Sequence, residues 1–179
     1  MVYDVPEVLS IRDATNRDAS VIAHIYNESI AAKDSTLDEE SKTAEEIQGW
    51  IAGFNGREAL LVLEDSRLMN APRVIGWGLI KRYTERTGYR FCCETAVYLR
   101  RSMVRRGYGS LLKQAIIERC RQYKYHHLHA KIFTENIASI EYNKRFGYEI
   151  VGIQKEIGYQ EGRWKDVTIM QLILTDVET

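Results

Sequence analysis

Residues 98–110 read YLRRSMVRRGYGS and join a predicted strand to the clearest helix pattern of the chain. Gly107 and Gly109 allow a tight turn that directs several free N–H groups to one place. The dipole of the following helix adds partial positive charge at the same place. Full positive charges come from Arg100, Arg101, Arg105 and Arg106. The stretch therefore predicts an anion site suited to phosphate groups.

An ordinary flexible turn beside a solvated basic run is the alternative interpretation, because Gly-x-Gly turns are common. Two other phosphate-binding loops do not fit. The dinucleotide fingerprint needs a third glycine, and Leu112 stands at that position. The P-loop needs a Gly-Lys-Ser/Thr triplet, which occurs nowhere in the chain.

The hydrophobic pattern on both sides of this junction predicts the order β-α-α-β-β-β-α-β-α-β-β. Helical spacing predicts helices over 17–31, 44–54, 108–123 and 137–146. Apolar and alternating runs predict strands over 8–12, 59–63, 74–81, 89–99, 127–133, 148–153 and 167–174. Three consecutive strands before the long helix favour a mixed sheet over a doubly wound parallel one.

Length and charge restrict the class of protein. A chain of 179 residues without a linker or an internal repeat predicts a single domain over 1–179. Lys+Arg and Asp+Glu both count 25, which argues against a general binder of nucleic acid or of a membrane surface. No apolar run approaches the roughly 20 residues of a membrane-spanning helix. The N-terminal residues lack the basic start of a signal peptide, and three cysteines make a poor disulfide framework, so we expect a cytoplasmic protein.

Further segments in a fixed order accompany the glycine turn. They are IYNE at 25–28, ETAVYL at 94–99, NIAS at 136–139 with FGY at 146–148, and GRWKDV at 162–167. Together with the turn they resemble the GNAT N-acetyltransferases, most closely the phosphinothricin and methionine sulfoximine acetyltransferase branch, over about residues 9–174. The resemblance implies an α+β fold of αβα sandwich type. Its sheet would be mixed, mostly antiparallel and flanked by helices.

The resemblance also implies acetyl-coenzyme A (acetyl-CoA) as co-substrate. The backbone of Val97, Tyr98 and Leu99 would run along the pantetheine arm. The pyrophosphate loop would comprise Val104, Arg105, Arg106, Gly107, Tyr108, Gly109 and Ser110, with Val104 where the family usually carries Gln or Arg. Asn136 and Ser139 would open the helix that contacts the coenzyme. Asn136 is equally well explained as a plain helix N-cap.

Acetyl transfer to an amine needs a proton acceptor and a stabilised oxyanion. Glu94 lies in mid-strand among apolar residues, where a carboxylate is costly without a function, so it is the candidate general base. The alternative is a structural carboxylate paired with a nearby arginine. The N–H of Val97 is the candidate oxyanion donor. Two aligned substrates can react directly, so no covalent enzyme intermediate is needed.

The departing thiolate is the third requirement. Asn143 stands where many relatives carry Tyr or His, and Asn can donate a hydrogen bond but cannot give up a proton near neutral pH. Either the thiolate leaves with hydrogen-bond help alone, or Tyr142 or Tyr148 protonates it.

On the acceptor side, relatives often carry Phe-Arg before the strand of the base, and Thr84 stands at the matching position. Arg82 and Arg86 lie close by as substitutes for that arginine. The acidic stretch 33–46 is either a solvated loop with an acidic helix start, or a wall that attracts an ammonium group. His127 and His129 share a strand face, but no third ligand has zinc-like spacing, so we expect no metal.

These patterns predict a cytoplasmic N-acetyltransferase that moves acetyl from acetyl-CoA to the primary amine of a small amino-acid-like acceptor, of the phosphinothricin or methionine sulfoximine type. One alternative is a protein or peptide amine acetyltransferase. Another is a non-catalytic sensor that binds acyl-CoA. The resemblance further implies a homodimer, and the apolar run 167–174 beside Trp164 fits an interface.

Overall fold

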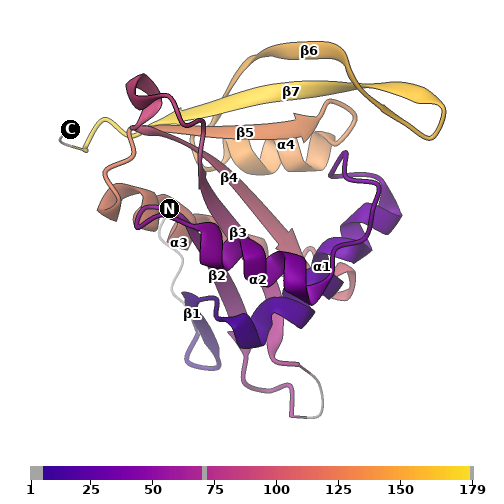
Figure 1. Ribbon diagram of the computed structural model, residues 1–179, viewed down its shortest axis with the longest axis vertical. Coiled ribbons are helices and arrows are strands. Elements are labelled where there is room, and N and C mark those ends of the chain that lie inside the picture. Colours follow the sequence, from indigo (N-terminus) through magenta and orange to yellow (C-terminus); the bar gives the residue numbers. More distant parts are fainter. Residues whose placement is uncertain (1–5, 70–71, 178–179) are drawn as a thin grey trace.

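The computed structural model describes residues 6–69 and 72–177, and it has the predicted order of elements. The strands are β1 (Leu9–Asp13), β2 (Ala59–Asp65), β3 (Val74–Arg82), β4 (Cys92–Leu99), β5 (His127–Phe133), β6 (Glu149–Gln160) and β7 (Arg163–Ile173). The helices are α1 (Ala19–Ala32), α2 (Ala44–Gly53), α3 (Tyr108–Gln122) and α4 (Ile137–Lys144). One seven-stranded sheet has the order β1-β2-β3-β4-β5-β7-β6 (Figure 1).

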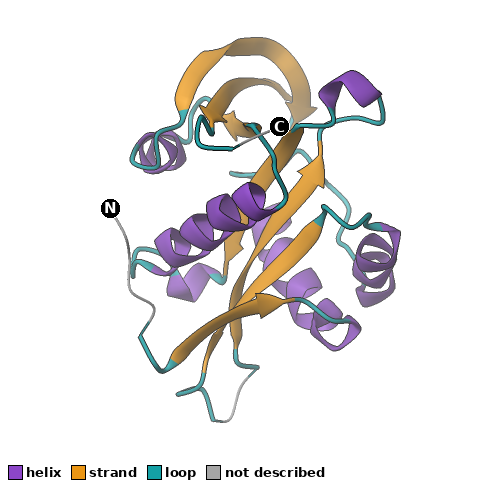
Figure 2. Ribbon diagram, turned by 90° about the vertical axis from the view of Figure 1, so that its left-hand side faces the viewer, coloured by secondary structure: helices purple, strands orange, loops and turns teal. Residues whose placement is uncertain are grey.

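Helices cover both faces of this sheet and enclose two hydrophobic cores (Figure 2). Alternation along β2 sends Leu61 and Leu63 into the core under α3, whereas Leu60 and Val62 pack against α1 and α2. Helix α3 lies close to the sheet because Gly78 has no side chain. An added Cβ there would overlap the side chain of Ile116. The fold is thus the predicted αβα sandwich.

The parallel pair β4–β5 lies between antiparallel pairs and is short. It joins Cys92 to His127, Cys93 to Leu128 and Glu94 to His129. Beyond these pairs the two strands diverge, and β5 turns away with β6 and β7 (Figure 1). Residues 95–99 remain paired with β3 on their other edge. Their backbone therefore faces a gap in the sheet, where polar groups can bind a ligand.

Three strand boundaries differ from the sequence-based prediction by three residues or more, and one of them is the start of β7, at Arg163 instead of residue 167. β4 begins at Cys92 instead of residue 89, because a 3-10 turn occupies Thr87–Tyr89. β6 continues to Gln160 instead of ending at residue 153. Its polar second half pairs with β7 across a register shift, where Glu156 N donates to Asp166 Oδ1 at 2.8 Å. Backbone pairing extends this strand where its side-chain pattern does not.

Candidate active site

A small cavity of about 80 Å³ occupies the gap between β4 and β5. Its walls come from residues 95–98 of β4, residues 130–133 of β5, Lys113 of α3 and the first turns of α4. Five predicted coenzyme and catalytic residues meet there: Val97, Tyr98, Asn136, Ser139 and Asn143. We call this cavity the β4–β5 slot.

The glycine turn leads directly from β4 into α3. Arg105 and Gly107 adopt left-handed φ values of 62° and 85°. Gly107 is the N-cap of α3, and a Cβ added there would meet no protein atom within 4 Å. Tyr142 Oη donates to Gly109 O at 2.6 Å, which ties the turn to α4 and to the slot. This arrangement of an open turn at a helix N-terminus suits an anion.

The four arginines of the turn have different surroundings. Arg101 pairs with Asp34 at 2.6 Å, and Arg100 donates to the Pro72 carbonyl at 3.2 Å. Arg105 and Arg106 are exposed beside the turn. We therefore expect these two, and not the whole basic run, to meet a bound phosphate.

The N-cap residue Asn136 and Asn143 of α4 both form hydrogen bonds within the protein. Asn136 Oδ1 accepts from Ser139 N at 3.0 Å, so it is the N-cap, and its Nδ2 donates to Asp34 O at 3.2 Å. Asn143 Nδ2 donates to Ser139 O at 2.8 Å. Asn143 Oδ1 is buried with no hydrogen-bond partner in the described part of the chain. A hydrogen bond from Asn143 to a thiolate would have to use the second hydrogen of Nδ2.

A second cavity of about 370 Å³ lies on the α1–α2 side of β4, and we call it the acceptor cavity. Aromatic rings form much of its wall, and Trp77 stacks on Tyr98 with ring centroids 4.6 Å apart. Asp38, Glu94 and Lys131 add charged groups. The two cavities share wall residues on β4 and β5, so they meet where these strands diverge.

Glu94 lies at this fork, in the last pair of the β4–β5 ladder. Its Oε2 accepts from Lys131 Nζ at 2.8 Å, and its side chain is 34% exposed. The expectation of apolar surroundings was wrong. Alternation along β4 buries Cys93 toward α3 and turns Glu94 to the open cavity.

Neither arginine proposed for the acceptor lines the acceptor cavity. Arg82 pairs with Glu58 and Glu85, and Arg86 is exposed in the turn before β4. Lys131 is the cation that the structure brings there instead. Sequence reasoning missed it, although it continues the strand face that carries His127 and His129.

Sequence reasoning also missed Lys113, which is 2% exposed in the wall of the slot. Burial lowers the pKa of Lys113 to about 8. The sequence feature that could have revealed it is the position of this lysine, directly after Leu111 and Leu112 on the apolar stripe of the helix.

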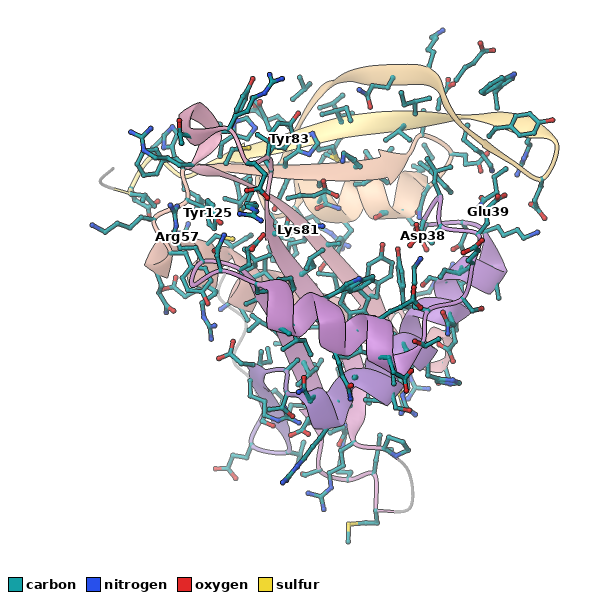
Figure 3. All side chains as sticks on the ribbon, viewed as in Figure 1. Asp38, Glu39, Arg57, Lys81, Tyr83 and Tyr125 are labelled. Atoms are coloured by element: carbon teal, nitrogen blue, oxygen red, sulfur yellow. The ribbon has the colours of Figure 1, made fainter. Side chains whose placement is uncertain are left out.

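The acidic stretch contributes to both regions. Asp34 binds Arg101 of the turn, whereas Asp38 accepts from Tyr26 Oη at 3.0 Å in the wall of the acceptor cavity. Burial raises the pKa of Tyr26 to about 12, so this phenol stays a donor. Figure 3 shows Asp38 and Glu39 on the segment after α1, across the view from Lys81 and Tyr83.

Residues 6–69 and 72–177 lack two further features. No cluster of three His, Cys, Asp or Glu side chains there could hold a metal ion. No helix in the same ranges is long and apolar enough to cross a membrane.

Comparison with known proteins agrees with this architecture. The family model described as an acetyltransferase (GNAT) domain matches residues 11–169. An L-methionine sulfoximine/L-methionine sulfone acetyltransferase of Pseudomonas paraeruginosa is 34% identical over 169 residues, which are 92% of this chain and 94% of that protein. The chain therefore belongs to the GNAT acetyltransferase family, and it is an acetyltransferase.

Two solved structures are also similar. A phosphinothricin acetyltransferase of Sinorhizobium meliloti, in complex with acetyl-CoA, has a TM-score of 0.86 at 28% identity and covers 96% of this chain and 92% of its own. A ribosomal-protein-alanine N-acetyltransferase of Brucella melitensis has a TM-score of 0.84 at 30% identity, with 92% and 99% covered.

The open turn at Gly107 generates a prediction for coenzyme binding. Gly107→Val should weaken acetyl-CoA binding at least about tenfold, because a branched side chain would strain the left-handed backbone and fill the open space. Gly162→Val is a matched control, since Gly162 also has a positive φ (74°) and open surroundings, but lies in the β6–β7 turn. Titration calorimetry with acetyl-CoA compares the two. Equal affinity in both folded variants would contradict a phosphate site at this turn.

Proposed function

We propose that the protein transfers acetyl from acetyl-CoA to the primary amine of a small amino-acid-like acceptor, of the methionine sulfoximine or phosphinothricin type. The observation that carries this proposal is the fork between β4 and β5. The β4–β5 slot is connected to the glycine turn by the hydrogen bond between Tyr142 of α4 and Gly109. The acceptor cavity is lined with charged groups, and it meets the slot beside Glu94.

On the donor side, the pantetheine arm would lie in the β4–β5 slot along residues 95–99, which are no longer paired with β5. The pyrophosphate would bind the N–H groups around Gly107 and the charges of Arg105 and Arg106. The thioester would then lie at the fork, with its carbonyl oxygen accepting from Val97 N–H. Asn136 and Ser139 would border the arm at the start of α4.

On the acceptor side, the charges of the cavity match an amino acid. Lys131 would attract the carboxylate, and Asp38 and Glu94 would attract the ammonium group before it loses its proton. A volume of about 370 Å³ suits a small molecule better than a folded protein terminus. The names of the methionine sulfoximine and phosphinothricin relatives support the same class of acceptor.

The reaction needs few groups from the protein. Glu94 takes a proton from the ammonium group, directly or through a water, and the neutral amine attacks the thioester carbon. Both substrates are held at one fork, so their alignment supplies much of the rate. Val97 N–H stabilises the oxyanion until the carbon–sulfur bond breaks.

We also propose a cytoplasmic homodimer. Apolar side chains on β6 and β7 are exposed over a continuous hairpin: Ile150, Val151, Ile153, Ile157, Tyr159 and Trp164. Single exposed apolar residues are normal, but this many on one hairpin favour a protein interface. A second copy of the chain is the partner that the family resemblance implies.

A panel of amines tests the proposed acceptor. With acetyl-CoA as donor, we expect the highest kcat/KM for methionine sulfoximine, phosphinothricin or another small α-amino acid, and a much lower value for a peptide with an N-terminal alanine. The ribosomal-protein relative makes the peptide the informative competitor. A clear preference for the peptide would reject the amino-acid acceptor, and acetyl-CoA binding without turnover of any amine would favour the sensor.

Substitution of Glu94 tests its assigned chemistry. Glu94→Gln keeps the shape of the side chain but removes the proton acceptor, so kcat should fall roughly 10²–10⁴-fold with acetyl-CoA affinity almost unchanged. Glu149→Gln, an exposed change on β6, is the control and should leave turnover at the wild-type level. Near-normal turnover in Glu94→Gln would show that the amine loses its proton to another group.

The assembly can be tested on the exposed hairpin. Sedimentation of the wild-type protein at micromolar concentration should give a dimer, and Ile153→Asp should shift it to monomer because it places a charge in the apolar strip. Met69→Asp is the control, because Met69 is 78% exposed but does not belong to the β6–β7 hairpin, and it should leave the dimer intact. A wild-type species of monomer mass would contradict the proposed assembly.

A further inference from the structure

Lys113 is a buried lysine without an ion-pair partner in the described part of the chain. It projects from α3 into the wall of the β4–β5 slot. Its Nζ lies 4.7 Å from the ring centroid of Tyr148 and 5.9 Å from that of Tyr142. A buried ammonium group with no carboxylate paired to it is costly, and such groups are usually paired or functional.

The groups that face Lys113 come from each neighbouring element. Tyr148 Oη and Thr95 Oγ1 of β4 are hydrogen-bonded to each other at 2.9 Å. Tyr142 Oη, on α4, donates to the Gly109 carbonyl. Cys120 lies two turns further along α3. None of these groups is a carboxylate, so the lysine charge remains available to a ligand in the slot.

Lys113 and Glu94 lie on opposite sides of β4. Val97 packs with the core under α3, on the Lys113 side, whereas Glu94 lines the acceptor cavity. Asn143, at the position expected to face the sulfur, lines the slot together with Lys113. An amine that attacks from the acceptor cavity would therefore push the sulfur toward the wall that contains Lys113.

We propose that Lys113 is the acid that protonates the leaving thiolate of coenzyme A, a role that Asn143 cannot perform. This inference rests on the proposed acetyl transfer. The amine lone pair forms the carbon–nitrogen bond, the carbon–sulfur bond breaks, and its electron pair goes to sulfur. One proton passes from Lys113 Nζ to the sulfur, and Lys113 regains a proton from water. The proton lost by the amine goes to Glu94.

The proton affinities of the Lys113 amine and of a thiolate are well matched. A simple thiol such as cysteine has a pKa of about 8.5. Burial lowers the pKa of Lys113 to about 8, whereas an exposed lysine would hold its proton too tightly to transfer it readily. Lys113 would be charged below about pH 8, and it would lose its stabilising effect on a thiolate above that pH.

Bound coenzyme A without the acetyl group provides a direct test. The ultraviolet absorbance of its thiolate can be titrated with pH in wild type, in Lys113→Met and in the control Lys155→Met, an exposed lysine of β6. We expect the bound thiol to ionise about one pH unit lower in wild type and in Lys155→Met than in Lys113→Met. Equal ionisation of free and wild-type-bound coenzyme A would overturn the proposal even if Lys113→Met did not fold.

Measurements of coenzyme affinity and of kcat distinguish an acid role of Lys113 from a purely structural one. At about pH 7.5, Lys113→Met should bind coenzyme A about twofold more weakly but desulfo-coenzyme A as tightly as wild type, because only the thiol senses the charge and a shift of one pH unit in its ionisation has only part of its effect at this pH. Its kcat should fall about 10- to 100-fold, and Lys113→Arg should restore thiolate stabilisation without proton transfer. Equal losses for both coenzymes would overturn the proposal. Failure of wild type to bind desulfo-coenzyme A would instead reject the proposed function itself.

Discussion

The parallel ladder between β4 and β5 ends after Glu94 and His129, and the functional site depends on this early end. Hydrogen bonds between the strands hold the sheet together on the Cys92 side. Past Glu94 the strands separate, and within residues 6–69 and 72–177 the backbone of residues 95–99 pairs with β3 alone. Because unpaired backbone groups inside a protein need partners, the gap is suited to a ligand with amides of its own, as in a pantetheine arm.

Alternation along β4 then divides the chemistry between two faces. Glu94 and Tyr98 face the acceptor cavity, while Thr95 approaches Tyr148 on the side of α3 and α4. The proposed base Glu94 and the buried cation Lys113 therefore lie on opposite sides of one strand. In the proposed reaction, the amine would lose its proton on the side that is partly open to water, and the sulfur would gain one on the closed side.

The sequence was sufficient for the order of elements, because apolar periodicity and caps are local features. The N-cap at Asn136, the capping box of Thr43 and Glu46 and the turn at Gly107 were all correctly predicted. The surroundings of Glu94 were not, because its ion pair with Lys131 depends on which residues face each other across β4 and β5. The burial of Lys113 was not predicted for a related reason. Nothing local shows whether a lysine on an apolar stripe snorkels to water or points into a cavity formed by three other elements.

Amide hydrogen exchange with and without acetyl-CoA measures the central claim most directly. We predict that acetyl-CoA slows exchange in two separate segments, residues 95–99 of β4 and residues 104–110 of the turn, since one ligand would span both. The paired end of β4, at Cys92 and Cys93, should change little. Protection confined to the β6–β7 hairpin, or absent from residues 95–99, would contradict a coenzyme site in the gap between the strands.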